Sequence, residues 1–468
     1  MTFVVEFLLI YILYFAKCNV GVSMEIYKRI IRIAFPIALQ QVIFTSVNFV
    51  DTLMIGFLGE VAIASVGLSN QFFFLYNLIL FGLVSGGGIF FAQYWGKKDE
   101  DGLSRSVALT ILSSLLFSIP FFLLSYFTPE LVLRFFSPDI EVIKAGIPYL
   151  KVIAFSYPLF AITMVFSFML RSIGKAHLPL IITIIELSTN IVLNYLLIFG
   201  KLGFPVLGIK GAAIGTLIAR AIGCIATVFI VYVGKLPGRA YFKHVAELNS
   251  KFVKNFFHYA LPTLANEFAW SLGFTMYSVV YAHMGTDVIA AQRVMSTIEG
   301  LAVSVTFSIA NAASVIIGNI LGVSKFDEAF ETSKKALKLA ELISVIAAII
   351  GIVTTFLVVD VFDVSEEVKN MVKVTIVISM GFLPVKIFNG MNVVGFLRAG
   401  GDTRFSFLVE ASTLWLIGVP LAAVGGLILD LSFPTVYFLT MMEEILKSII
   451  LFFRYRSKKW LRNVLDEA

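Results

Sequence analysis

Cysteine, histidine and charged residues are scarce in this 468-residue sequence. The two cysteines, Cys18 and Cys224, provide no disulfide framework, and the four histidines are scattered without the spacing of a metal site. Charged residues make up 14% of the chain, whereas a typical soluble domain has about 25%. No Gly-x-x-x-x-Gly-Lys-[Ser/Thr] motif occurs, which argues against a primary ATP-driven pump. These shortages exclude a soluble protein and indicate an integral membrane protein.

Apolar segments account for most of the chain, because 59% of the residues are hydrophobic. Twelve such segments lie near 30–57, 63–93, 103–127, 143–170, 178–199, 211–233, 253–283, 287–321, 336–359, 367–397, 404–429 and 432–453. A bilayer offers no water to backbone N–H and C=O groups, so each segment is predicted to be a transmembrane helix. The connections are too short for a soluble catalytic domain.

The first 23 residues resemble neither a signal peptide nor a segment long enough to cross a bilayer readily. Their apolar run is short, is interrupted by Glu6, and lacks a basic leader and a small-residue cleavage site. Met24 stands just before Ile26-Tyr27-Lys28-Arg29, which is typical of a cytoplasmic lead-in to a first helix. We therefore expect residues 1–23 to be an extension and the chain to begin naturally at Met24.

Basic residues alternate across the connecting loops. With both termini inside, 24 lysines and arginines after Met24 lie on the inner side and six lie in the outer loops. This bias is the positive-inside signature of a multi-pass plasma-membrane protein with cytoplasmic ends. Membrane topology therefore explains the net charge of +6, and no nucleic-acid partner is expected.

The sequence repeats itself. Residues Pro36, Gly59, Ala64, Gln93 and Gly96 recur as Pro262, Gly285, Ala290, Asn319 and Gly322, every pair 226 residues apart (262 − 36 = 226). The motif Leu170-Arg171-x-x-Gly174 recurs as Leu397-Arg398-x-x-Gly401 at an offset of 227 (397 − 170 = 227). Because six helices are an even number, both copies insert the same way round, as parallel repeats. We expect two six-helix lobes, 24–234 and 253–455, joined by a cytoplasmic loop, 235–252, and followed by a cytoplasmic tail, 456–468.

These features resemble the multidrug and toxic compound extrusion (MATE) family from Met24 to the C-terminus. The resemblance rests on the early proline of the first helix, VDTLMIGFLG, Gln93-x-x-Gly96, Arg171-x-x-Gly174, ELSTNIVLNYLLIFG and their echoes, and on LPTLANEFAWSLGF and LRAGGDTRF. It implies an all-α, twelve-span exporter coupled to a cation, Na⁺ or H⁺, which moves organic cations by alternating access between two lobes. No cofactor and a monomeric chain are expected.

Asp51 is the first candidate functional residue, because a charged side chain inside a membrane costs about 2.5 to 3.5 kcal/mol and normally faces a partner or a wet cavity. Helical rise places Asp51 roughly 27 Å, Asn190 roughly 18 Å, Asn194 roughly 24 Å and Thr216 roughly 22 Å from the inner boundary. Asn190 and Asn194 share one helix face. A carboxylate, amide oxygens and a hydroxyl suit Na⁺, and a buried carboxylate equally suits a proton. Some MATE relatives have a second carboxylate at the position of Asn194, so the ion stays open, as does a role for the asparagines in bridging helices alone.

Five further residues are candidates for the substrate cavity. Glu186 lies one turn inward of Asn190, and Glu267 lies one turn beyond Pro262. Many MATE proteins place the second acid about one turn farther on, where this chain has Trp270. The repeat register pairs Gln41 with Glu267 and Tyr277 with Asp51 (267 − 41 = 226, 277 − 51 = 226). Glu267 is expected to contact a cationic substrate or a proton, with a structural pairing as the alternative.

Other polar and aromatic residues within the apolar segments have weaker assignments. Most of the remaining acids, Glu299, Glu410, Glu443 and Glu444, are interpreted as interhelix partners of bases that include Arg220, Arg293, Lys386 and Lys447. Phe73, Phe74 and Phe160 could stack on aromatic substrates, and the sequence does not choose among them.

Three other classes of membrane protein fit the sequence less well. A lipid-linked oligosaccharide flippase is the alternative function, but such proteins usually have additional helices and a strongly basic cavity. A major facilitator is disfavoured, because the loop after the second helix reads GKKDEDGLSR and lacks the usual glycine- and arginine-rich pattern. An intramembrane enzyme would need a catalytic constellation at one depth, and none is present in the sequence.

Overall fold

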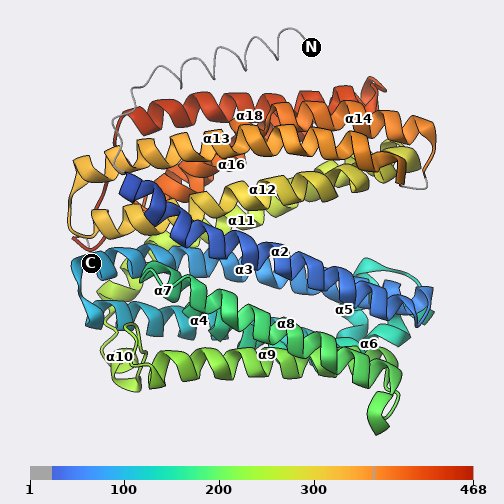
Figure 1. The fold of residues 1–468 in the computed structure, drawn as a ribbon, viewed down its shortest axis with the longest axis horizontal. Coiled ribbons are helices and arrows are strands. Elements are labelled where there is room, and N and C mark those ends of the chain that lie inside the picture. The colour runs from blue at the N-terminus through green and yellow to red at the C-terminus, as the bar shows by residue number, and fades with distance from the viewer. Residues whose placement is uncertain (1–23, 362–363, 467–468) are drawn as a thin grey trace. The chain divides into compact units, whose positions relative to one another are not determined.

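The computed structural model describes residues 24–361 and 364–466, and within them every regular element is a helix (Figure 1). The predicted extension, residues 1–23, lies outside the described residues. The first half contains α2 (Met24–Gly56), α3 (Glu60–Lys97), α4 (Glu100–Phe127), α5 (Pro129–Phe136), α6 (Ile140–Ala154), α7 (Ser156–Ser172), α8 (His177–Phe199), the 3₁₀ turn η1 (Lys201–Gly203), α9 (Gly208–Val233) and α10 (Phe242–Ala246).

The second half is built in the same order and includes three π-helical stretches. It contains α11 (Ser250–Met284), α12 (Thr286–Leu321), α13 (Phe326–Val358), the 3₁₀ turn η2 (Val359–Val361), α14 (Glu366–Gly381), α15 (Leu383–Gly390), η3 (Met391–Leu397), α16 (Thr403–Thr413), η4 (Leu414–Gly418), α17 (Val419–Ala423), η5 (Val424–Ile428) and α18 (Phe433–Arg456). The π-helical stretches are η3, η4 and η5. No pattern in the sequence predicts them.

Each of the twelve predicted apolar segments coincides with one helix or with a consecutive set of helices. Among the described residues, eight helices are long and apolar enough to cross a membrane, and two bent pairs raise that number to ten. The helices α11 and α18 supply the remaining two segments. Helix α12, with 36 residues, is about 54 Å long, so it extends beyond a hydrocarbon core of about 30 Å. The described chain is an all-α membrane protein with the predicted twelve helices in two six-helix repeats.

The backbone carries the sequence repeat. Gly59 and Gly285 precede α3 and α12 with φ angles of 100° and 134°, and Gly174 and Gly401 have φ angles of 79° and 73°. Side chains with a Cβ rarely adopt these conformations, because the Cβ crowds the following carbonyl. The repeated glycines therefore mark the same two turns in both halves of the chain.

Gly174→Ala tests this explanation by itself, because no heavy atom lies within 4 Å of the position that its Cβ would occupy. We expect a loss of about 1 to 2 kcal/mol from the left-handed backbone alone. Gly174→Asn should lose less, since asparagine tolerates this region better. Thermal unfolding in detergent measures the stability of both variants. Equal melting temperatures for the intact protein, Gly174→Ala and Gly174→Asn would contradict the need for glycine at this turn.

One helix in each repeat is bent at an equivalent place. The α6 and α7 axes meet at 47° around Phe155, and α14 and α15 with η3 meet at 44° around Phe382 (382 − 155 = 227). A proline follows each break, Pro158 in α7 and Pro384 in α15. Proline lacks an N–H donor, and its ring clashes with the carbonyl four residues earlier. The bends therefore follow from the sequence.

Contacts divide the described chain into two compact units. The first unit is Leu39–Glu267 with the tail from Val464, and the second unit is Phe268–Asn463 with the residues up to Ala38. In the first unit α3 packs against α4, α6 and α7 around a core that includes Tyr76 and Tyr157. The boundaries of the two lobes, 24–234 and 253–455, stay a prediction.

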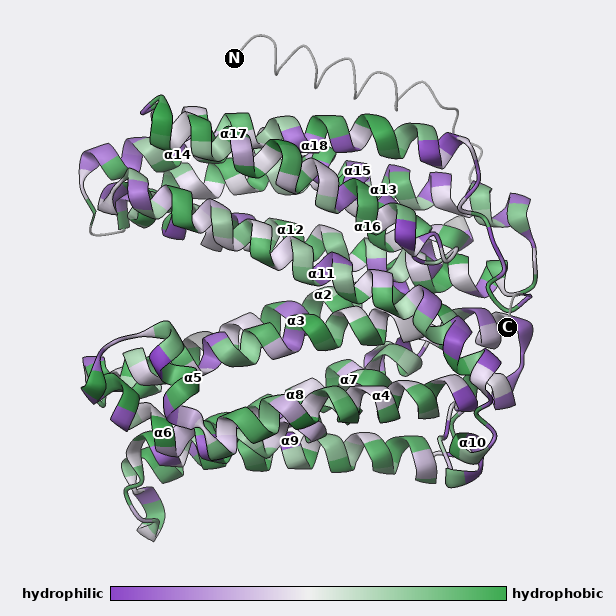
Figure 2. Ribbon diagram, turned by 180° about the vertical axis from the view of Figure 1, so that it is seen from behind, coloured by the Kyte–Doolittle hydropathy of each residue, from purple (hydrophilic) through white to green (hydrophobic). Residues whose placement is uncertain are grey.

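Hydrophobic residues cover the helices along most of their length, and hydrophilic residues gather at the helix ends and in the loops (Figure 2). Several ends are capped by side chains. Asp99 accepts a hydrogen bond from the Gly102 amide at 2.8 Å at the start of α4, and Asp139 accepts one from the Glu141 amide at 2.9 Å at the start of α6. These caps satisfy amides that have no partner within the helix.

Candidate functional site

Helices α8 and α9 run side by side in the first unit because α9 presents small residues to α8 (Figure 1). Gly211, Gly215, Ala219 and Gly223 recur every four residues and so share one face of α9. A Cβ on Gly211 would lie 2.5 Å from the backbone oxygen of Leu197. Without those side chains the two backbones approach closely, as small residues allow in membrane helices.

The same glycines leave room for polar side chains of α8. A Cβ on Gly215 would lie 2.3 Å from Asn194 Oδ1, and a Cβ on Gly223 would lie 2.9 Å from Glu186 Oε2. Each glycine therefore accommodates one of the predicted site residues within the helix interface.

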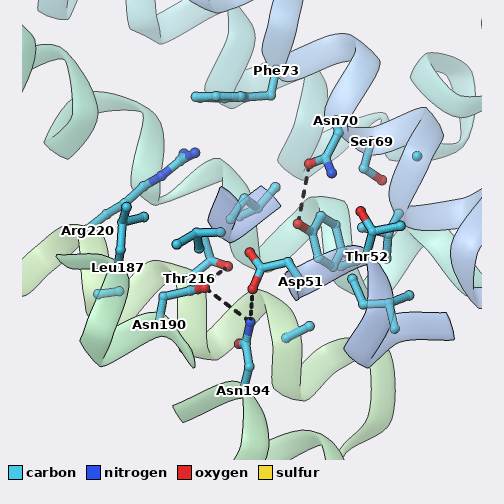
Figure 3. Close-up of a pocket in the computed structure, with 18 of the residues that line it drawn as sticks. Asp51, Thr52, Ser69, Asn70, Phe73, Leu187, Asn190, Asn194, Thr216 and Arg220 are labelled. Carbon is cyan, nitrogen blue, oxygen red and sulfur yellow. Dashed lines mark hydrogen bonds between the residues drawn. The ribbon is translucent and has the colours of Figure 1, made fainter. Parts of the chain in front are cut away.

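A chain of hydrogen bonds links the four residues that the sequence analysis placed at one depth (Figure 3). Asn194 Nδ2 donates to Asp51 Oδ1 at 2.9 Å and to Asn190 Oδ1 at 3.3 Å. Asn190 Nδ2 donates to Thr216 Oγ1 at 3.0 Å. Asp51 comes from α2, the asparagines from α8 and Thr216 from α9, so three helices meet at this cluster.

Asn194 Oδ1 is a buried acceptor that receives no hydrogen bond within the described structure. The whole residue is 1% exposed, so a bare carbonyl oxygen in this position is costly. Rotation of the amide would bring this oxygen to face the Asp51 carboxylate, which is unfavourable unless a cation or a proton lies between the two oxygens. The cluster can therefore offer an additional hard oxygen ligand to a cation.

A cavity of about 410 Å³ opens beside this cluster, lined by α2, α3, α6, α8 and α9 of the first unit. Asp51, Glu186, Asn190, Asn194 and Thr216 all line it. Its volume falls in the range of small-molecule pockets, about 300 to 1,000 Å³. The wall also includes aromatic side chains, among them Phe73, Phe74 and Tyr149, and the polar side chains of Asn70 and Asn77.

Arg220 also lines the cavity, although the sequence analysis treated it only as a structural partner of an acid. It lies one turn after Thr216 on α9, so the four-residue spacing from Thr216 could have indicated that both share one helix face. Its guanidinium carbon lies 4.1 Å from the centre of the Phe73 ring. The cavity thus contains one fixed positive charge together with two carboxyl groups, those of Asp51 and Glu186.

The other predicted cavity residues do not line this cavity. Gln41 is exposed on α2, and Glu267 is partly buried on α11. Trp270 packs on Phe274, with ring centres 4.3 Å apart. Tyr277 is buried and donates a hydrogen bond of 2.6 Å to Glu443 Oε2. The repeat register therefore puts different chemistry at equivalent positions.

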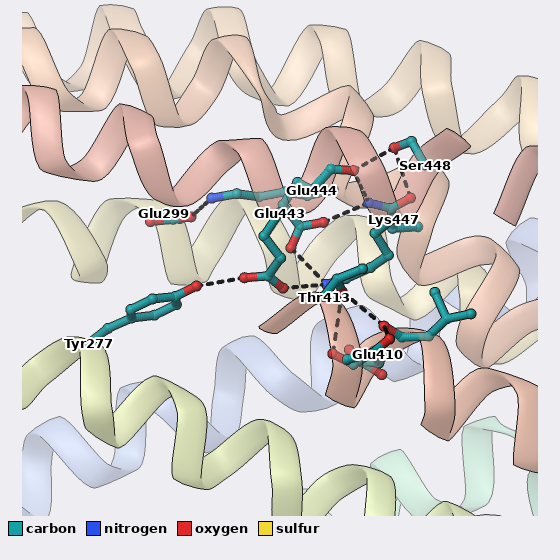
Figure 4. Close-up of polar contacts among 12 residues, drawn as sticks. Tyr277, Glu299, Glu410, Thr413, Glu443, Glu444, Lys447 and Ser448 are labelled. Carbon is teal, nitrogen blue, oxygen red and sulfur yellow. Dashed lines mark hydrogen bonds and ion pairs between the residues drawn. The ribbon is translucent and has the colours of Figure 1, made fainter. Parts of the chain in front are cut away.

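The second unit buries its own charged network (Figure 4). Lys386 Nζ on α15 lies 2.5 Å from Glu299 Oε1 on α12, and Tyr437 donates to the same carboxylate at 3.2 Å. On α18, Lys447 Nζ lies 2.8 Å from Glu443 Oε1 and 3.1 Å from Glu444 Oε1. Lys386 thus meets an acid of another helix, as interpreted, whereas both of these carboxylates belong to the same helix as Lys447. No group of three or more histidine, cysteine or acidic residues in the described ranges is arranged to hold a metal ion.

Gly215→Ala should distort the cavity cluster, because its Cβ would overlap Asn194 Oδ1. We expect a loss of about 1 to 3 kcal/mol, the usual cost of overpacking, and a large loss of transport. Gly300→Ala on α12 is the control, since no atom lies within 4 Å of its Cβ position and alanine favours a helix. Thermal unfolding measures both variants, and a Gly215→Ala protein as stable as the control would contradict this packing.

Comparison with known proteins gives a consistent result. The model of the MatE family matches the chain twice, over residues 36–196 and 262–424. An uncharacterized transporter, YisQ of Bacillus subtilis, is 24% identical over 430 residues, which cover 92% of this chain and 94% of YisQ. A probable multidrug resistance protein, NorM of Thermotoga maritima, is 25% identical over 441 residues, which cover 93% of both chains.

Solved structures share the fold. A MATE protein in a bent conformation superposes with a TM-score of 0.84 at 18% identity, covering 92% of this chain and 95% of that chain. A transporter of the MOP superfamily from Pyrococcus furiosus, described as having a binding pocket of reverse polarity, superposes with a TM-score of 0.83 at 18% identity over the same fractions of the two chains.

Proposed function

This chain belongs to the MatE family, and from that premise we propose that it exports small organic cations in exchange for Na⁺ or H⁺. Transport proceeds by alternating access between the lobes 24–234 and 253–455. The protein acts as a monomer in the plasma membrane, with both termini in the cytoplasm. The coupling ion is its only inorganic partner, and it is a transporter rather than an enzyme.

This proposal rests mainly on the hydrogen-bonded cluster of Asp51, Asn194, Asn190 and Thr216. The cluster lies beside a cavity of about 410 Å³, which is large enough for a small molecule. A carboxylate inside a membrane is expensive to keep and typically marks an ion or proton pathway. The cavity has two carboxyl groups and one arginine, which differs from the strongly basic cavity expected of a lipid-linked oligosaccharide flippase.

Coupling follows from competition for the charge of Asp51. An ionised carboxylate attracts an organic cation into the cavity, whereas a bound Na⁺ or proton neutralises it and removes that attraction. When Na⁺ binds, the Asn194 amide turns its free oxygen toward the ion. Ion and substrate must favour different states by a few kcal/mol for such exchange to be effective.

Ethidium efflux from proteoliposomes tests the proposal, with Na⁺ and H⁺ gradients imposed separately. We expect one gradient to drive efflux well above that of protein-free liposomes. If neither gradient drives ethidium efflux, the protein is not an antiporter of organic cations, and the flippase function is favoured.

A further inference from the structure

The surroundings of Arg220 are not those of an arginine that forms a structural ion pair with a carboxylate. Its Nη1 donates one hydrogen bond, of 2.8 Å, to Ser156 Oγ. The guanidinium carbon lies 4.1 Å from the centre of the Phe73 ring and 5.2 Å from that of Phe160. Arginine is permanently charged and carries five N–H donors in a planar fork. Most of these donors are therefore not used by protein groups in the described structure.

An arginine within a membrane normally pairs with an acid, because an uncompensated charge is costly there. No carboxylate of the described residues forms a close ion pair with Arg220, although its charge acts through space on Asp51 and Glu186, which line the same cavity. Figure 3 shows its side chain directed toward Phe73 and away from the cluster around Asp51. The cavity thus has an acidic side, with Asp51 and its amide neighbours, and a basic, aromatic side, with Arg220 and Phe73.

A purely cationic substrate gains nothing from Arg220, because like charges repel. A carboxylate would accept two parallel N–H bonds from the guanidinium fork, and Phe73 would support the aromatic ring that carries it. An amine on the same molecule would be drawn to Asp51. Thr216 and Arg220 are four residues apart on α9, so the two sides are separated by about 6 Å along the helix, less than the length of a drug-sized molecule.

We propose that Arg220 binds the anionic group of zwitterionic aromatic substrates, whose amine is held on the Asp51 side of the same cavity. This assignment rests on the proposed export function and adds to it a residue that discriminates, among amine-bearing substrates, those that also carry a carboxylate. Arg220 is accordingly a specificity-determining residue of the cavity.

The test uses three probes that differ in charge: norfloxacin, which has a carboxylate and an amine, its ethyl ester, which has only the amine, and ethidium, which has only a positive charge. Binding to purified full-length protein is measured by calorimetry, and efflux is measured in proteoliposomes. The variants are Arg220→Met, Arg220→Lys and the control Lys210→Met, which removes an exposed charge from the same helix outside the cavity.

The intact protein should bind norfloxacin at least about tenfold more tightly than the ester, because only the acid pairs with the guanidinium. Arg220→Met should abolish this preference and leave the affinity for the ester and for ethidium unchanged or higher. Arg220→Lys should retain part of the preference, since it keeps the charge without the fork. Lys210→Met should behave like the intact protein.

Equal affinity of the intact protein for norfloxacin and its ester would overturn the proposal, whatever the variants do. An unchanged preference in Arg220→Met would overturn it too, and if that variant does not fold, an unchanged preference in Arg220→Lys has the same meaning. Failure of the export function is distinguishable. In that case neither gradient drives efflux of any probe, while the binding preference and its dependence on Arg220 persist.

Discussion

Asp51→Asn is expected to abolish gradient-driven efflux while leaving the protein folded. Asparagine has nearly the same shape as aspartate and can still hydrogen-bond to Asn194, whose amide donates to Asp51 at 2.9 Å. It cannot take up a proton at neutral pH or neutralise a sodium ion. If coupling occurs at this carboxylate, the rate under the driving gradient should fall at least about tenfold, toward that of protein-free liposomes.

The assay compares the intact protein, Asp51→Asn and Glu130→Gln in the same lipid, with each gradient imposed separately. Glu130 is the control because it is an exposed acid of α5 that pairs with Arg134 on the same helix, 2.7 Å away. Its removal should leave efflux unchanged. Normal gradient-driven efflux by Asp51→Asn would show that this carboxylate is structural and would remove the proposed coupling site.

Lys447→Met is expected to cause the largest loss of stability. Lys447 is 3% exposed and compensates two buried carboxylates, those of Glu443 and Glu444. Without the ammonium group these carboxylates lie close together with only neutral donors, Tyr277 to Glu443 at 2.6 Å and Asn389 to Glu444 at 2.6 Å. Removing one partner of a buried ion pair typically costs about 3 to 5 kcal/mol, because the other charge remains buried.

Two further variants separate the charge from the packing. Combining Lys447→Met with Glu443→Gln and Glu444→Gln removes all three charges and should restore most of the stability. Lys334→Met breaks an exposed pair with Glu331 of 2.7 Å and should cost less than about 1 kcal/mol. Thermal unfolding in detergent measures the series. If Lys447→Met melts at the same temperature as Lys334→Met, the buried network contributes no net stability.

Hydropathy and the repeat were sufficient to predict the helices. A membrane forces each apolar segment to satisfy its own backbone, so length and composition alone indicate a span. The offset of 226 or 227 residues predicted two copies of one unit, and in the structure Gly59 and Gly285 share positive φ angles at equivalent positions. The bends near Pro158 and Pro384 follow from proline chemistry in the same way. The π-helical stretches were not predictable, because no residue type requires them.

Helical rise predicted the depth of the candidate site, because a fixed distance per residue converts position in the sequence into height in the membrane. Asp51, Asn190, Asn194 and Thr216 are joined by hydrogen bonds in the structure. The role of the cluster in coupling remains a proposal. Rise says nothing about which way a helix is rotated, so the sequence could not show that Arg220 lines the same cavity as Thr216.

The sequence by itself determined the twelve helices and their duplication, and it indicated which polar residues lie at one level, since all three depend on properties local to the chain. Tertiary structure alone decided which side chains meet. The glycine face of α9 sets how closely α8 approaches, and that packing directs Glu186 and Asn194 to the cavity. It also leaves Arg220 facing the same cavity without a close ion pair to a carboxylate of the described residues. Such rotation depends on shape complementarity between helices, which is a property of the pair and is absent from either sequence segment.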